Sequence, residues 1–371
     1  MGAYLGFLKR RHADTLLTRL RVAGHHVLGP QVRDGAITFA PLEHWDELPR
    51  GWVDEQAPGR YRLRATDSPR CFLWTTGPQA LKPLLFVPEE PLWSVHRQRG
   101  HDLAFRAHHP QPAKRAVIGV RACDLAALAL QDRHFRGGTH PDSRYLTRRR
   151  DLFLVAVHCA RAADTCFCAS TGDGPRAHDG FDLALSELDE GYLVEAGSEA
   201  GEAIARDLPL VPPTPAQQAQ AEREIRAAAR QHRALPGHDL RAPLRARRES
   251  PHWADVGERC LSCANCTSVC PTCFCHRHEE RPDPVEDRSE HWRAWDSCFT
   301  PGHSTIHGIV IREDTALRYR QWLTHKLADW HDQYGRSGCV GCGRCLTWCP
   351  AGIDLTAEVA ALLATPEGGE S

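Results

Sequence analysis

The hydrophobic positions near the start of the chain predict a region that mixes strands and helices. The spacing of five leucines is a broken helical pattern that ends near Gly24: Leu5, Leu8, Leu16, Leu17 and Leu20. Short alternating runs follow at 36–39 and 60–63, which is the pattern of strands with one buried face. Residues 1 to about 110 are therefore expected to form mixed α/β structure.

A parallel α/β unit is predicted between residues 115 and 157. The apolar runs 116–120 and 152–157 have the composition of buried strands. Between them, an apolar segment from Leu125 to Phe135 predicts a helix, and Asp124 is its expected N-cap. A strand, a helix and a second strand in this order are typical of a parallel sheet.

Residues 199–250 change character and are interpreted as a connector. The proline-rich run 211–215 breaks regular structure. Thr214 is a plausible N-cap with Pro215 in the first helical position, and an Ala/Gln/Arg-rich helix should run to about His232. Beyond the connector, apolar positions from Leu317 to Tyr334 suit one helical face.

Composition and charge narrow the class of protein. The chain has 371 residues, with 46 Lys+Arg against 47 Asp+Glu and a formal net charge of −1, which argues against a nucleic-acid binder. No apolar run approaches the roughly 20 residues that span a bilayer, and no signal-peptide core follows the start. We therefore expect a cytoplasmic protein with no membrane span.

The 16 cysteines carry the strongest chemical signal. In a long chain without an export signal they indicate metal binding rather than disulfides. One spacing, Cys-x2-Cys-x2-Cys-x3-Cys-Pro, occurs twice, from Cys260 to Pro271 and from Cys339 to Pro350. This repeat is typical of bacterial two-cluster ferredoxins, in which the fourth cysteine of each block binds the other cluster.

That rule assigns the ligands of two [4Fe–4S] clusters. The first set is Cys260, Cys263, Cys266 and Cys349, and the second is Cys339, Cys342, Cys345 and Cys270. Structural zinc is the alternative. A zinc site, however, does not require a third cysteine at equal spacing, a fourth cysteine and a following proline, and here all three features occur in both blocks. A cubane with four cysteine ligands has no open iron, so this part of the chain is expected to carry electrons and to have no catalytic residues.

Four further cysteines suggest a third cluster. Cys123 and Cys159 each follow a predicted buried strand, and the ends of neighbouring parallel strands meet at one edge of a sheet. Cys166 and Cys168 lie shortly after Cys159. The alternative is that all four are ordinary buried cysteines. Cys273, Cys275 and Cys298 either bind a metal or line a cluster pocket, and lining is favoured; Cys71 is isolated and is interpreted as structural.

Together these patterns predict three regions. Residues 1–200 form an α/β (α+β) domain with a partly parallel sheet and a possible cluster of its own, 201–250 a helical connector, and 251–371 a two-[4Fe–4S] ferredoxin-like α-helical domain. The chain contains neither G-x-G-x-x-G nor G-x-x-x-x-G-K-[ST]. A flavin or NAD(P) site is therefore expected on a partner subunit.

Several segments resemble the β (iron–sulfur, electron-transfer) subunit of soluble bidirectional NiFe hydrogenases, or sulfhydrogenases, and the first subunit of anaerobic sulfite reductase is built similarly. The carrying segments are Arg121-Ala122-Cys123-Asp124-Leu125, Thr165-Cys166-Phe167-Cys168, Cys270-Pro271-Thr272-Cys273-Phe274-Cys275, Trp295-Asp296-Ser297-Cys298 and Cys339-Val340-Gly341-Cys342-Gly343-Arg344-Cys345. The family often has proline where this chain has Ala122, and this chain departs from the family again at 170–175.

The resemblance implies a complex in which this subunit joins two partners. One partner would bind flavin and exchange electrons with NAD(P)H, and the small and large NiFe hydrogenase subunits would handle hydrogen. The nearest alternative is the electron-input subunit of an anaerobic sulfite or sulfur reductase. Two other classes differ more: an iron–sulfur redox sensor, which would show a basic face, and a self-contained oxidoreductase with a flavin site in residues 1–200.

Overall fold

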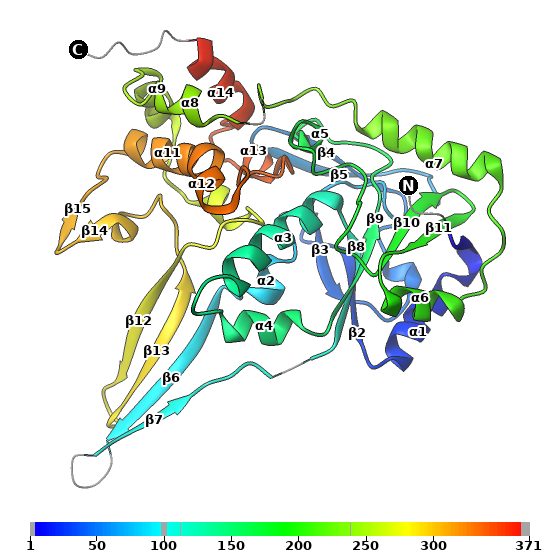
Figure 1. The fold of residues 1–371 in the computed structure, drawn as a ribbon, viewed down its shortest axis with the longest axis horizontal. Helices are drawn as coiled ribbons and strands as arrows, with labels where there is room; N and C mark the ends of the chain where they lie inside the picture. Colours follow the sequence, from blue (N-terminus) through cyan, green and yellow to red (C-terminus); the bar gives the residue numbers. More distant parts are fainter. Residues whose placement is uncertain (1–3, 98–101, 112, 238, 365–371) are drawn as a thin grey trace.

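The computed structural model describes residues 4–97, 102–111, 113–237 and 239–364, and it is built on a seven-stranded sheet (Figure 1). The strand order is β1-β11-β10-β9-β8-β2-β3. Neighbours among β2, β8, β9 and β10 are parallel and the outer pairs are antiparallel, so the partly parallel α/β sheet expected from the sequence is confirmed. The bounds are β1 Gly6–Lys9, β2 His26–Arg33, β3 Ala36–Pro41, β8 Arg115–Val120, β9 Leu152–Val157, β10 Leu183–Leu188 and β11 Gly191–Ala196.

Helices cover both faces of this sheet. Successive strand residues point to opposite faces, so each strand contributes side chains to both helical layers. Ile118 and Val155 pack with α1 (Asp14–Val22) and the end of α6 (Glu199–Arg206). Val117 and Leu154 pack with α3 (Ala122–Arg136) and α4 (Ser143–Arg149).

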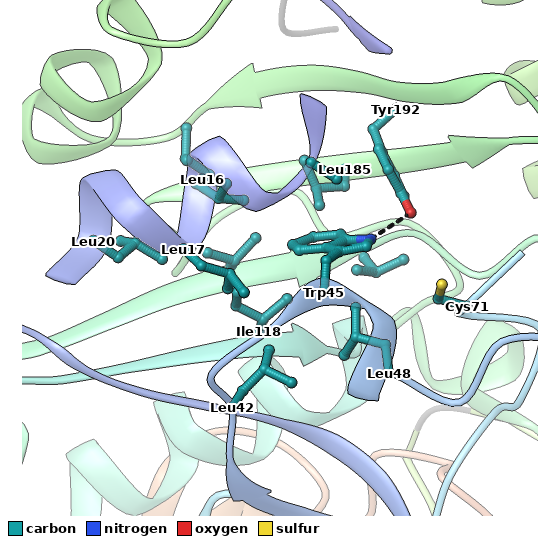
Figure 2. Packing of buried hydrophobic residues seen from close by; sticks show 14 of the residues in the cluster. Leu16, Leu17, Leu20, Leu42, Trp45, Leu48, Cys71, Ile118, Leu185 and Tyr192 are labelled. Atoms are coloured by element: carbon teal, nitrogen blue, oxygen red, sulfur yellow. Dashed lines mark hydrogen bonds between the residues drawn. The ribbon is translucent and has the colours of Figure 1, made fainter. Parts of the chain in front are cut away.

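The core on the α1 side centres on Trp45, which lies among the leucines of α1 and the central strands (Figure 2). Its indole N–H donates a hydrogen bond of 2.9 Å to the hydroxyl of Tyr192. Cys71 belongs to the same cluster and is completely buried. Its place in this core fits the structural interpretation.

Two local expectations differ from the structure. The leucine spacing forms a helix only in its second half, because Leu8 lies in β1, whose backbone pairs with β11. Such pairing is a tertiary contact that local periodicity does not encode. The helix after β8 begins at Ala122 with Arg121 as N-cap, so Asp124 occupies its third position, where the carboxylate accepts a hydrogen bond from the Arg121 N–H at 3.3 Å.

The connector contains α7 (Pro215–Ala228), which ends before His232, and α8 (Arg241–Arg245). Thr214 caps α7 as expected, and its hydroxyl accepts from the Gln217 N–H at 3.2 Å.

Several short elements lie outside the large sheet and the connector. They are β4 Trp52–Ala57, β5 Arg60–Ala65, α2 Lys82–Leu85, α5 Cys168–Thr171, β14 Thr305–Ile306 and β15 Ile309–Val310.

The chain beyond the connector contains six α-helices in the described residues, none longer than ten residues. The expected helical face from Leu317 to Tyr334 forms, but His325–Asp329 is a turn of π-helix within it. Gly335 closes this run in the left-handed conformation at φ 73°. The helices are α9 His252–Arg259, α10 Asn265–Ser268, α11 Thr315–Thr324, α12 Trp330–Tyr334, α13 Arg344–Thr347 and α14 Leu355–Ala364.

A second, four-stranded sheet projects from the body of the molecule as an arm (Figure 1). Its strands, in the order β12-β13-β6-β7, are β12 His276–Asp283, β13 Arg288–Trp295, β6 Glu89–Arg97 and β7 Leu103–Ala107. All pairs are antiparallel. The arm therefore joins strands from both halves of the chain. In the described residues, no helix combines the length and apolar character needed to cross a membrane.

Candidate iron–sulfur centres

The first predicted ligand set lies on one pocket. Cys260 follows the end of α9, and two residues of the loop after it, Ser262 and Ala264, have φ values of 48° and 65°. This backbone turns the loop around the space that its cysteines face. Cys260, Cys263, Cys266 and Cys349 all line this pocket, which we call the first pocket. Its other walls are mostly apolar, with Phe299, Tyr319, Trp322 and Ile353 among them.

The second predicted set lines a neighbouring pocket. Cys270, Cys339, Cys342 and Cys345 lie together on what we call the second pocket. Cys345 also belongs to the lining of the first pocket, so the two pockets adjoin. Each pocket thus brings three cysteines of one block together with the fourth cysteine of the other, as in the crossed arrangement that the spacing predicts, and Cys345 lies on the wall between the pockets. The identity of what these thiols bind stays a prediction.

Burial shapes the acidity of these thiols. It raises the pKa of Cys339 to about 12 and raises the pKa of Cys345 well above its usual range. Cys270 differs, because a hydrogen bond with Cys273, assisted by the Lys326 ammonium, holds the pKa of its thiol well below the usual range. Iron binds the thiolate, so uptake of a cluster releases protons from the buried cysteines.

The third predicted group gathers at the carboxyl edge of β8 and β9. Cys123 is the second residue of α3, and it packs with Cys168 in one buried cluster. Cys159 lies within electrostatic range of Cys166 and Cys168. The side-chain amide of Gln231 donates to the Cys168 sulfur at 3.2 Å. The structure therefore brings these four cysteines to one region, and a third cluster there stays a prediction.

In the part of the chain that the structure describes, no group of three or more His, Cys, Asp or Glu side chains lies close enough to hold a single metal ion. This applies equally to the two pockets and to the third group. A [4Fe–4S] cubane does not need such a group, because each of its four irons binds a single cysteine.

The third group touches the second pocket directly. Cys342 belongs to the same buried cluster as Cys123 and Cys168. The Phe167 N–H donates to the Gly341 carbonyl at 2.8 Å. Gly341 has a φ of 62°, and a Cβ at this position would lie 2.5 Å from the Cys168 nitrogen. Glycine thus permits a close approach of the third group to the second pocket, which also adjoins the first pocket.

The cysteines that the sequence left unassigned lie beside the pockets. A backbone N–H at Cys298 donates to the Cys275 sulfur, and these two residues flank the β12–β13 hairpin of the arm. Cys273 lies next to Cys270, with which it shares a hydrogen bond. Burial raises the pKa of Cys298 to about 12.

Sequence reasoning missed two charged groups at these sites. The Lys326 ammonium lies 3.4 Å from the Cys270 sulfur, and the side chain is only 4% exposed. Arg344, between two predicted ligands, forms a buried ion pair of 2.8 Å with Asp124. One signal for Lys326 was available, since only four of the 46 basic residues are lysine: Lys9, Lys82, Lys114 and Lys326.

Comparisons with known proteins agree with this site. Residues 259–353 match the family model of a 4Fe-4S dicluster domain. The chain is 34% identical over 247 residues to a protein of Pyrococcus furiosus described as sulfhydrogenase 2 subunit beta. The match covers 65% of this chain and 72% of that protein. No solved structure matches the chain.

Proposed function

Because the chain belongs to the family of sulfhydrogenase beta subunits, we propose that it relays single electrons between a NiFe hydrogenase module and a partner that binds flavin and NAD(P)H. Family membership and the dicluster domain make it an iron–sulfur electron-transfer subunit of an oxidoreductase. The partners and the direction of electron flow belong to the proposal. A complex with other subunits follows from the family.

The observation that carries the proposal is the arrangement of the cysteines. Cys260, Cys263, Cys266 and Cys349 would hold one [4Fe–4S] cluster, and Cys270, Cys339, Cys342 and Cys345 the other. The shared wall at Cys345 favours electron exchange between the two clusters. With all four ligands supplied by cysteine, neither cluster has an open position for substrate. Backbone amides and the apolar walls would tune the potentials.

The third cysteine group would extend this path. Cys123, Cys159, Cys166 and Cys168 would hold a cluster at the edge of the large sheet, beside Cys342. Electrons from one partner would enter or leave there, and those of the other partner at the first pocket, where Cys263 is exposed. On this proposal the regions 1–200, 201–250 and 251–371 are a domain that holds the third cluster, a connector and the two-cluster domain.

Substitution within the purified complex tests the relay. Cys263→Ser should damage the first cluster and Cys342→Ser the second, and each should block electron transfer from hydrogen to NAD(P). Hydrogen oxidation with an artificial dye at the NiFe subunits, and NAD(P)H oxidation at the flavin subunit, should persist. Cys71→Ala is the control, because Cys71 lies in the sheet core away from both pockets.

Full overall turnover in both cysteine variants would contradict the relay. The partners that co-purify identify the complex. A NiFe subunit supports the proposal, whereas a sirohaem subunit would replace it with electron input to a sulfite reductase.

A further inference from the structure

A buried lysine, Lys326, contacts one predicted ligand of the second pocket, Cys270. Lys326 lies in the π-helical turn His325–Asp329 and lines that pocket. Its ammonium is 3.4 Å from the Cys270 sulfur and 3.0 Å from the Thr272 hydroxyl oxygen. π-Helical turns occur frequently at functional sites, because the extra residue redirects a side chain.

The charge of Lys326 is not neutralised by a carboxylate. In the described residues, no Asp or Glu forms an ion pair with it. Arg344 also lies beside the second pocket, but Asp124 pairs with it at 2.8 Å. The charge of Lys82, which is buried nearby, also acts on Cys270, but the hydrogen bonds of its ammonium go to the backbone carbonyls of Thr267 and Ser268, at 3.2 and 3.0 Å.

The first pocket offers no comparable group. Besides its cysteines, the described residues that line it are apolar or uncharged, with Asn265 and Tyr319 the polar ones. The two predicted clusters therefore share a wall and a ligand pattern but differ in the electrostatics of their surroundings.

We infer that Lys326 selectively raises the reduction potential of the cluster in the second pocket, by donating a charged hydrogen bond to the Cys270 ligand. This inference rests on the ligand sets of the proposed function. Reduction adds one negative charge to the cluster and its sulfurs, and an adjacent cation stabilises that charge. The effect is strong because the ammonium is buried and poorly screened by solvent. Lys326 is thus a positioning residue, which acts through Cys270 and sets the difference in reduction potential between the clusters of the two pockets.

A redox titration of the whole chain, loaded with iron and sulfide under anaerobic conditions and followed by EPR, tests this role. Lys326→Met removes both the charge and the donor. We expect the equilibrium constant for reduction of the second cluster to fall at least tenfold, which is about 59 mV for one electron. The first cluster should keep its potential. Cys342→Ser, which alters one signal, identifies the second cluster in the spectrum.

Lys114→Met is the matched control, because it removes an exposed lysine that lies just before β8 and should shift neither potential. Lys326→Gln keeps an N–H donor without charge and should lower the same potential by a smaller amount; it is measured if the methionine variant takes up less iron. A signal assigned to the second cluster that keeps the wild-type potential in the Lys326 variants would overturn this inference alone. A wild-type chain without cubane signals would overturn the proposed function instead.

Discussion

At the scale of single residues, the ion pair between Asp124 and Arg344 links the chemistry of the two halves of the chain. Both side chains are 2% exposed. Arg344 also donates to the Gly77 carbonyl at 2.9 Å, so it is fixed from two directions. Asp124 directly follows the predicted ligand Cys123 in the sequence, and Arg344 directly precedes the predicted ligand Cys345. Loss of one charge would therefore affect the third group and the second pocket together.

Asp124→Asn should destabilise the protein strongly, because it leaves the Arg344 guanidinium buried without a counter-charge. We expect a loss of about 3–5 kcal/mol in the free energy of unfolding, measured by denaturant titration of the iron-loaded chain. Glu55→Gln is the control, since it removes an exposed ion pair with Arg64 and should cost less than about 1 kcal/mol. Equal small losses in both variants would show that the buried pair is dispensable.

At the scale of elements, the contact between the loop at Gly341 and the segment Thr165–Cys168 holds the third group against the second pocket. The loop requires glycine at position 341 for two reasons: its φ is positive, and the backbone of Cys168 leaves no room for a Cβ. Neither segment contributes a long helix or strand to the contact. The approach thus depends on backbone shape as well as on the buried apolar contact of Cys168 with Val340 and Cys342.

Gly341→Ala should therefore push the two segments apart. The left-handed conformation alone costs an alanine about 1–2 kcal/mol, and the collision with Cys168 adds to this. Thermal unfolding should show the loss, together with a lower iron content. Gly302→Ala is the matched control, because its Cβ meets nothing within 4 Å. An unchanged melting temperature in Gly341→Ala would mean that the loop relaxes freely.

Elements differ in how far the sequence determines them. The two cysteine sets could be predicted because three of the four ligands in each are local and their spacing reflects the loop around a cluster. The buried strands β8 and β9 could be predicted from continuous apolar runs. The arm could not, because β13 pairs with β6 across nearly two hundred residues and its strands carry charged side chains. The π-helical turn that places Lys326 leaves no mark in the apolar spacing.

At the scale of the whole molecule, the second pocket contacts both the third cysteine group, at the edge of the large sheet, and the first pocket, where Cys263 is exposed. The arm and the Asp124–Arg344 pair both join the first half of the chain to the second. The cluster region is therefore packed into the α/β part rather than suspended from it.

The iron content of the intact chain tests this arrangement. Two cubanes give about eight irons per chain, and a third raises the value to about twelve. Cys159→Ser should lower the content by about four irons if the third group binds a cluster, whereas Cys71→Ala should leave it unchanged. A wild-type chain with about eight irons, unaffected by Cys159→Ser, would leave the third group as packing cysteines.

The crossed position of Cys349 has a consequence for biosynthesis. About 80 residues separate it from Cys266, so on the proposed assignment the first block waits for its fourth ligand while the ribosome makes them. At about 5–20 residues per second, that delay is on the order of 4–16 seconds. The large sheet can form during this time, but neither cubane can be closed. Ligation of either cubane by four cysteines must therefore follow translation of the second block, and until then the early thiols are open to oxidation.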